Sequence, residues 1–332
     1  FIMKFIYAFL ILLGVITIHE FGHFIAARIV GVRVKEFSIG IGPKLYQKQG
    51  VETLFSIRAL PLGGYCRFDD EEDEENLGFS YKSSDKVDYE DASNGKKLII
   101  LISGILMNMF TALLILFLMF SFYGYPSTYV EKIVPGSIAE EVGIQEGDHI
   151  LKIDDIKVNT ASELMATEVY KNKKYTLTVI RSGEELLIPI DSKDGKIGVY
   201  FAVRKNPGIA IKQSFTTAGM FISEIFKAIK EIFVGKADNL MGIVGFVATV
   251  GTMQGVNLNV ILMIIVNISI SLAVFNILPI APLDGGQILL VLIESIIGRK
   301  LSDKAKTIIM SIGIVFILYI FIRSLMNDFS RF

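Results

Sequence analysis

Four long runs of apolar residues dominate the pattern of this chain. They extend from Met3 to about Val30, from Leu98 to Tyr123, from about Leu258 to Leu278 and from about Thr307 to Ile322. Because a helix needs about 20 predominantly apolar residues to cross the hydrocarbon core of a bilayer, each run is long enough to be a membrane span. The first run lacks the small-residue cleavage site of a signal peptide, so we interpret it as a retained span.

Between the spans, two segments show the alternation of apolar and polar residues that is typical of β-strands. Val51–Phe68, with a break at Gly63-Gly64, is predicted to form a β-hairpin. Ser127–Asp191 combines short strand patterns with turn residues, and its later strands are expected at Val169–Ile180 and Glu185–Ile190. The pattern therefore predicts a small β-region after the first span and a mainly β domain after the second.

Three further segments leave alternatives open. Ile209–Phe233 carries an apolar stripe at helical spacing, which fits an amphipathic helix either on the outer membrane surface or packed on its own domain. Leu240–Val256 is apolar and rich in glycine, which fits a segment that dips into the membrane, crosses it or packs on a neighbouring helix. Asp69–Glu75 is an unbroken run of acids, which favours a solvated cytoplasmic loop over a gate at the mouth of a site.

The composition narrows the class of protein. Of the 332 residues, 52% are hydrophobic and 20% are charged, and the mean hydropathy is +0.54. Four spans account for the apolar excess, which argues against both a purely soluble protein and a transporter with only short loops. The net charge of -1 gives no indication of nucleic-acid binding. Cys66 is the only cysteine, which excludes an internal disulfide and a cysteine-based zinc cluster.

Lysine and arginine residues near the span ends predict the orientation of the chain. They gather in the link after the first span and in the short link between the third and fourth spans, where they are Arg299, Lys300, Lys304 and Lys306. Both links are therefore expected in the cytoplasm, which places the segment from Pro126 to about Asn257 outside.

The predicted organisation has seven segments. In order they are a first transmembrane helix (1–30), a cytoplasmic, membrane-associated β-region with the acidic loop (31–96), a second transmembrane helix (97–125), a mainly β domain (126–192), an extracytoplasmic amphipathic helix with the glycine-rich segment (193–257), a third transmembrane helix (258–290), and a cytoplasmic link with a fourth transmembrane helix (291–332).

The first span contains the candidate chemistry, because residues 19–23 spell His-Glu-Phe-Gly-His, an HExxH motif. On a helix, residues four apart share a face, so His19 and His23 can bind one metal ion, and zinc suits such ligands. Glu20 is placed to take a proton from the attacking water. Ionisable residues inside spans are costly and usually functional, although two histidines that merely pack between helices are the alternative. The third histidine, His149, is expected in a surface loop.

A catalytic zinc usually has three protein ligands, and Asp284 is the candidate for the third. It follows the third span in the sequence Asn-Ile-Leu-Pro-Ile-Ala-Pro-Leu-Asp-Gly-Gly of residues 276–286. Pro279 and Pro282 must interrupt the helix, and irregular backbone at membrane depth occurs where it is buried in protein or lines a cavity. The alternative is that Asp284 only caps the helix that follows.

HExxH in the first span together with NxxPxxxLDGG in a later one resembles the site-2 protease family of intramembrane zinc metalloproteases, in particular the bacterial regulator-of-sigma-E branch. Further matching segments are Phe21–Phe24 with Ala27-Arg28, Phe37–Pro43, Pro61–Tyr65, Ser103-Gly104 with Asn108, and Gly242–Gly245. The resemblance implies that His19, His23 and Asp284 hold zinc, that Glu20 is the base, and that Asn276 holds substrate or intermediate. Cys66 stands where an aliphatic residue is common in the family.

The resemblance also gives the β segments a function. The β-region near the site would offer an edge strand to an unwinding substrate, or else would only pack. The segment from Tyr129 to Ile190 resembles one bacterial PDZ domain, circularly permuted, which would screen out substrates with bulky outside domains or else only stabilise the spans.

The sequence thus predicts a polytopic α-helical membrane protein with about four transmembrane helices, a membrane-associated β-region and one extracytoplasmic PDZ (mainly β) domain. The expected location is a bacterial cell membrane, with the active site toward the cytoplasm. The expected activity is zinc-dependent cleavage of single-span membrane proteins, such as anti-sigma factors or signal peptide remnants. A metal or proton transporter and a PDZ scaffold with a vestigial site are the alternatives.

Overall fold

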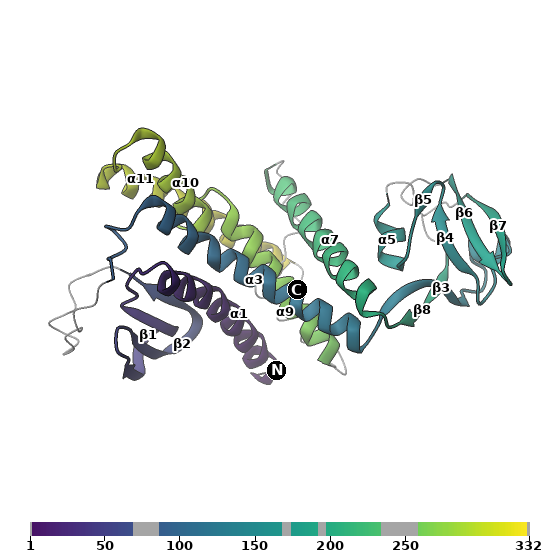
Figure 1. Cartoon of the computed structure of the whole chain (residues 1–332), viewed down its shortest axis with the longest axis horizontal. Coiled ribbons are helices and arrows are strands. Elements are labelled where there is room, and N and C mark those ends of the chain that lie inside the picture. The colour runs from purple at the N-terminus through teal and green to yellow at the C-terminus, as the bar shows by residue number, and fades with distance from the viewer. Residues whose placement is uncertain (1, 69–85, 168–173, 192–196, 234–257, 331–332) are drawn as a thin grey trace. The chain divides into compact units, whose positions relative to one another are not determined.

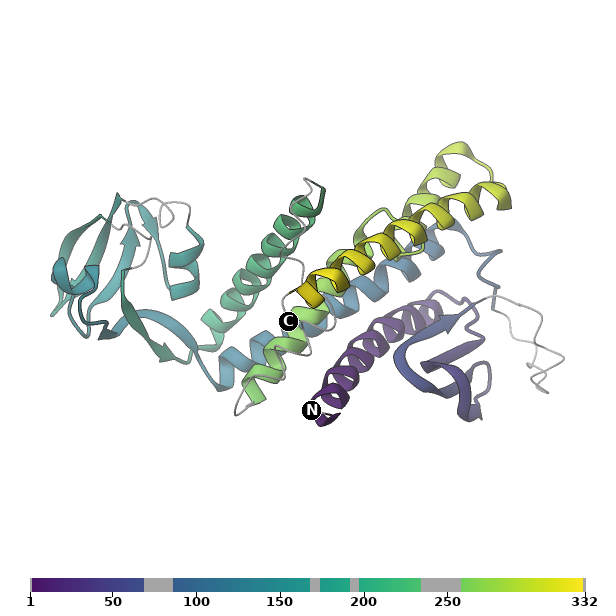
Figure 2. The same ribbon diagram turned by 180° about the vertical axis from the view of Figure 1, so that it is seen from behind.

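The computed structural model describes residues 2–68, 86–167, 174–191, 197–233 and 258–330. The acidic run Asp69–Glu75 and the glycine-rich segment Leu240–Val256 lie outside the described residues. The chain divides into two compact units, which are described separately: residues 1–112 with 222–332, and Leu113–Phe221. Figure 1 gives the element labels, and Figure 2 shows the same ribbon from behind.

Four helices in the described residues are long and apolar enough to cross a membrane. They are α1 (Ile2–Ile29), α3 (Asn94–Phe122), α9 (Leu258–Ile277) and α11 (Asp303–Ser330), with candidate spans at Ala8–Ile29, Asn94–Phe122, Leu258–Ile277 and Asp303–Met326. These agree with the four spans predicted from the apolar runs. A shorter helix, α10 (Asp284–Ile297), lies between α9 and α11.

In the first unit, α1 packs against α9 and against a sheet made of two long strands, β1 (Glu36–Gln49) and β2 (Leu54–Arg67) (Figure 1). The start of β1 is central in this sheet. Its residues 36–39 pair in parallel with residues 54–57 and antiparallel with residues 64–67, while residues 44–49 pair antiparallel with residues 54–58. The last part of β2, Gly64–Arg67, therefore pairs with β1 along one of its edges.

The expectation that Val51–Phe68 forms a hairpin by itself is wrong, because the segment pairs with β1. Most of the segment is the single strand β2, and the turn lies before it, at residues 50–53. Gly63 has a φ of 147°, and it bends β2 instead of ending it. In β1, Gly40 and Gly42 both have a φ of 85° and bend the strand. Glycines that suggest turns in the sequence lie at bends within strands here. For this reason β1 was not predicted from the sequence.

The second unit contains a sheet with the strand order β7-β6-β4-β3-β8, and β5 pairs with β4. Its elements are β3 (Tyr125–Ile133), α4 (Ile138–Glu141), β4 (His149–Ile153), β5 (Ile156–Lys157), α5 (Ala161–Ala166), β6 (Lys174–Arg181), β7 (Glu184–Asp191) and β8 (Val199–Arg204). The described residues of this unit share an apolar core, in which Ile150, Ile153 and Leu177 are fully buried. The predicted boundary at residue 192 leaves out β8, a short edge strand that pairs with β3.

Two further expectations for this part of the chain have definite outcomes. His149 does not lie in a loop; it begins β4, and its ring stacks on that of Tyr129 with centroids 3.8 Å apart. The amphipathic pattern forms α7 (Pro207–Phe233), which begins where the Asn206 side chain accepts hydrogen bonds from two backbone N–H groups. The start of α7 packs on α5, because Gln213 is buried and donates to Ser162 Oγ at 2.6 Å.

Candidate metal centre

Helix α1 presents both histidines on one face, toward α3. His19 and His23 are only 5% and 6% exposed, and their Nε2 atoms lie 3.2 Å apart. The two helices approach closely because Gly22 has no side chain: a Cβ atom there would lie 2.6 Å from the carbonyl oxygen of Ser103. The HExxH spacing and this close contact place the two imidazoles side by side inside the unit.

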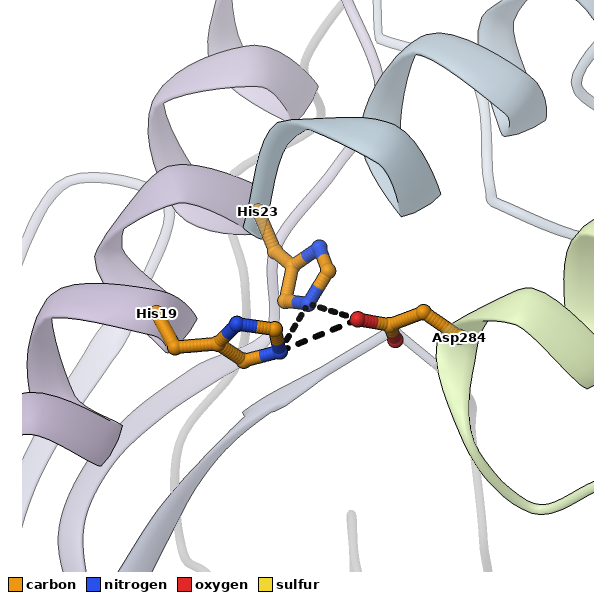
Figure 3. A group of neighbouring side chains, drawn as sticks. All are labelled: His19, His23 and Asp284. Carbon is orange, nitrogen blue, oxygen red and sulfur yellow. Dashed lines mark hydrogen bonds and ion pairs between the residues drawn. The ribbon is translucent and has the colours of Figure 1, made fainter. Parts of the chain in front are cut away.

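Asp284 reaches the histidines from the opposite side (Figure 3). Helix α9 ends at Ile277, the proline-containing segment changes direction, and α10 begins at Asp284. Its Oδ2 lies 3.0 Å from Nε2 of His19 and 3.4 Å from Nε2 of His23. Leu283 occupies the N-cap position and no side-chain capping bond is formed, so the capping alternative for Asp284 is not what the structure shows.

The donor atoms fit a zinc ion in chemistry and in spacing. Two imidazole nitrogens and a carboxylate oxygen are common zinc ligands, with bonds of about 2.0–2.2 Å. Neighbouring donors of a tetrahedral site are then about 3.3 Å apart. The three donors here are separated by 3.0, 3.2 and 3.4 Å, so they outline one face of such a tetrahedron. The Oδ2 atom of Asp284 is buried without a hydrogen bond, as expected for an atom that binds a cation.

Groups on α3 orient the histidine rings. The Nδ1 atom of His23 lies 2.8 Å from the carbonyl oxygen of Ile100, which can only accept, so Nδ1 carries the proton and Nε2 presents a lone pair to the site. His19 Nδ1 lies 3.3 Å from the buried Asn108 amide, whose Oδ1 has no partner in the recorded orientation. Reversing that amide lets Oδ1 accept the Nδ1 proton, which leaves Nε2 of His19 free to bind metal.

Two other predicted residues also lie at the centre. Glu20 is half-buried, and its carboxylate accepts a hydrogen bond from the backbone N–H of Cys66 in β2. Asn276, near the end of α9, places its Nδ2 atom 3.3 Å from Nε2 of His19. All five predicted site residues therefore come together, and β2 contributes a backbone group to the arrangement.

The sequence analysis noted Ser103-Gly104 with Asn108 as a family pattern but gave these residues no role. Gly104 faces the rings directly: a Cβ atom on it would lie 2.5 Å from Nε2 of His23 and 2.8 Å from Cε1 of His19. Asn108 follows one turn later on the same face of α3. A glycine and an amide four residues apart in a mostly apolar span were the signal in the sequence for the face of α3 that supports the rings.

Two buried histidines on a helix long enough to cross a membrane, together with the aspartate at the start of α10, define a class of metalloenzyme with membrane helices. Comparison with known proteins identifies the class: the model of Peptidase family M50 matches residues 7–320. The chain therefore belongs to peptidase family M50, the site-2 protease family, and it is a zinc metalloprotease with several membrane helices.

Individual relatives match along almost the whole chain. A protein of Clostridium perfringens is 32% identical and covers 98% of both chains. A protein of Clostridium acetobutylicum is 32% identical over 94% of this chain and 93% of its own length, and one of Agrobacterium fabrum is 28% identical over 99% and 97%. All three carry the name "Putative zinc metalloprotease".

Proposed function

We propose that this chain is an intramembrane protease that cleaves single-span membrane proteins. The observation that carries the proposal is the convergence of His19, His23 and Asp284 on helices α1 and α10, with α1 itself apolar enough to span the bilayer. Peptide hydrolysis at such a centre requires a segment of substrate to reach the interior of the helical unit. Membrane-spanning segments of other proteins are the substrates that share this environment.

His19, His23 and Asp284 hold the zinc ion, which when bound polarises the scissile carbonyl and lowers the pKa of water. Glu20 accepts the proton of the attacking water and delivers it to the leaving amine. The Cys66 N–H fixes the direction of the Glu20 carboxylate. Asn276, with its amide 3.3 Å from His19, is close enough to the centre to donate to the substrate carbonyl.

The edge segment Gly64–Arg67 of β2 receives the substrate. A helical peptide bond is shielded by its own hydrogen bonds, so cleavage requires an extended backbone, and pairing with an edge strand supplies that conformation. Gly64–Arg67 pairs with β1 on one side, and its Cys66 N–H points away from β1 to the base. A substrate strand beside this segment therefore passes next to Glu20.

The second unit acts as a PDZ domain that screens substrates outside the cell membrane. Its antiparallel sheet, with the short helix α5 between β5 and β6 and the edge strand β8, fits a circularly permuted PDZ arrangement. The lysine and arginine residues after α1 and between α10 and α11 favour a cytoplasmic position for those links and an outside position for this unit. Anti-sigma factors already trimmed by another protease and signal peptide remnants are substrates of the required size.

Glu20→Gln tests the mechanism in proteoliposomes that contain a single-span substrate. Removing the base should lower the cleavage rate by about 100-fold or more while zinc content stays equal to wild type. Glu294→Gln is the matched control, since Glu294 is also a buried carboxylate of the first unit but contacts Leu301 and Lys306. Wild-type cleavage by Glu20→Gln would refute the assignment. Zinc flux across the vesicles that survives the substitution would favour a transporter.

A further inference from the structure

Glu36, at the start of β1, is a fully buried carboxylate that the mechanism above does not use. Its Oε1 accepts hydrogen bonds from Ser56 Oγ at 2.5 Å and from Arg58 Nη2 at 2.8 Å, and its Oε2 lies 3.3 Å from Arg67 Nη2. The Tyr65 hydroxyl donates to the same carboxylate. These five residues, the Glu36 cluster, join the start of β1 to the first and last parts of β2.

The carboxylate of Glu36 is held in its charged form. Burial alone would raise the pKa of the Glu36 carboxyl, but the hydrogen bonds from Ser56, Arg58 and Tyr65 outweigh burial and hold this pKa below its ordinary value. Burial and the nearby Glu36 charge raise the pKa of the Tyr65 hydroxyl, which therefore stays neutral and donates. The buried charge of Glu36 fixes the positions of the side chains that donate to it, because moving any of these donors away leaves a buried charge with fewer compensating partners.

The cluster and the candidate base share the segment Gly64–Arg67. Side chains alternate along a strand, so Tyr65 and Arg67 project to the face that carries Glu36 while the Cys66 side chain projects to the other face. There Cys66 packs against the apolar cluster that includes Ala26, Ala27 and Val34. The Cys66 N–H lies in the plane of the sheet and donates to Glu20.

The fit of this segment against α1 is close. A Cβ atom on Gly64 would lie 2.6 Å from the carbonyl oxygen of Ser38 and 3.8 Å from Cγ of Glu20. A small displacement of the segment therefore changes the contact with Glu20. Tyr65 and Arg67 are the side chains on either side of Cys66 in the sequence, and both are tied to Glu36.

We propose that Glu36 is a positioning residue for the protease reaction: through Tyr65 and Arg67 it fixes the edge segment so that the Cys66 N–H orients the Glu20 carboxylate. Glu36 itself touches neither metal nor substrate. The catalytic part of this inference rests on the function proposed above, whereas the structural part does not.

Cys66 provides a readout that is independent of activity. It is the only cysteine of the chain, its side chain is partly buried, and it lies in the segment concerned. The rate at which N-ethylmaleimide modifies the detergent-solubilised full-length protein therefore reports the opening of this segment.

In Glu36→Gln, we expect Cys66 modification to accelerate about tenfold and kcat to fall about tenfold, with KM within about twofold and zinc content unchanged. Tyr65→Phe removes a single donor from the cluster and should move both rates in the same directions by about fivefold. This milder variant keeps the test decisive if Glu36→Gln fails to fold, which a loss of bound zinc would reveal.

Glu52→Gln is the matched control. Glu52 lies in the turn between β1 and β2, and it pairs with Lys86 and with Arg28 at 3.5 Å. Its substitution removes one carboxylate charge from the same β-region without touching Gly64–Arg67, so modification rate and kcat should stay within about twofold of wild type.

Two results would overturn the inference: modification of Cys66 at the wild-type rate in both cluster variants, or faster modification with an unchanged kcat. If wild-type protein binds zinc but cleaves no membrane substrate, the proposed function fails, and the modification rates alone still decide whether Glu36 holds the segment.

Discussion

The two units of the molecule distribute apolar and polar side chains in opposite ways. In the second unit, the strands place many of their apolar residues in one core, with Ile150, Ile153 and Leu177 fully buried, and most of their charged residues are exposed. In the first unit, the helices expose apolar residues, such as Leu106 and Phe110 on α3, each 60% exposed. Their buried positions instead include polar residues such as Asn108 and Ser269. The first pattern fits water as the surrounding solvent, and the second fits lipid.

This difference determines what a buried polar residue signifies. Lipid gives apolar helices no hydrophobic reason to associate, so close glycine contacts and polar contacts join them. Among the helices of the first unit, buried polar residues such as His19, His23 and Asn108 lie at the metal centre. In the second unit a buried polar residue such as Asp148 has its own ion-pair partner, Arg181, and supports the fold. The comparison predicts that substitutions of the buried polar residues at the metal centre damage activity, whereas substitutions of buried charged residues in the second unit damage stability.

The largest effect is expected from the metal ligands. His19→Ala, His23→Ala and Asp284→Ala each remove one of three donors, and the protein should then retain little zinc and no measurable cleavage. Metal analysis of purified protein and the vesicle cleavage assay provide the measurements. His149→Ala is the control, because His149 is a half-buried histidine of the second unit, and it should keep both zinc and activity. If the His23→Ala protein bound as much zinc as wild type, His23 would not be a metal ligand, and the contrast between the buried polar residues of the two units would fail.

The next effect tests the close approach of α3 to the rings. In Gly104→Ala the new methyl group would overlap the His23 ring, whose Nε2 lies 2.5 Å from the Cβ position, so zinc affinity should fall by about 10- to 100-fold. Titration with a competing chelator measures this affinity.

The control for this substitution is Gly219→Ala on α7. A Cβ atom at Gly219 meets nothing within 4 Å, so the same change should leave zinc affinity unaltered and strengthen the helix slightly. Equal zinc affinity in Gly104→Ala and Gly219→Ala would show that α3 does not support the rings.

The ligands of the site were predictable from the sequence because each depends on local spacing. HExxH places two rings on one helix face. The prolines before Asp284 indicate a break in the helix, and a catalytic zinc needs a third protein ligand, which together pointed to Asp284. The supporting groups on α3 were not predictable in their roles. That helix is apolar nearly all round, so the sequence does not reveal which face meets α1, and the contact of Ile100 uses only a backbone oxygen.

The pairing of the strands in the two sheets was also not predictable from the sequence. Strand β1 contains Gly-Ile-Gly-Pro at residues 40–43, which resembles a turn, and only pairing with β2 makes it a strand. Strand β8 is a short edge strand whose partner, β3, is about seventy residues earlier. Pairing between distant segments is a tertiary property, and the alternation of residues in one strand carries little information about it.

The smallest effect on activity, and the clearest effect on stability, is expected from Asp148 in the second unit. Its buried carboxylate accepts two hydrogen bonds from Arg181, at 2.8 and 2.7 Å, and one from the Gln145 N–H at 2.9 Å. Asp148→Asn should destabilise this unit by about 2–4 kcal/mol, because it leaves a partly buried arginine without its counter-charge. Zinc content and cleavage of a short single-span substrate should stay at wild-type levels.

The same carboxylate predicts a pH dependence that is confined to the second unit. Burial would raise the pKa of Asp148, but the bonds from Arg181 and Gln145 prevail and hold this pKa below its ordinary value. A lowered folded pKa stabilises the unit at every pH above the unfolded value of about 3.9, and this contribution disappears as the pH falls through the folded pKa. Hydrogen exchange of β4 and β6 in the full-length protein, corrected for the intrinsic rate, should therefore accelerate below about pH 4 in wild type but much less in Asp148→Asn.

Asp191→Asn removes an exposed ion pair with Lys174 and should behave like wild type, because such surface pairs contribute about 0–1 kcal/mol. Equal acid sensitivity in all three proteins would mean that Asp148 does not support the second unit as described, and the contrast between the two units would lose its main example of a structural buried charge.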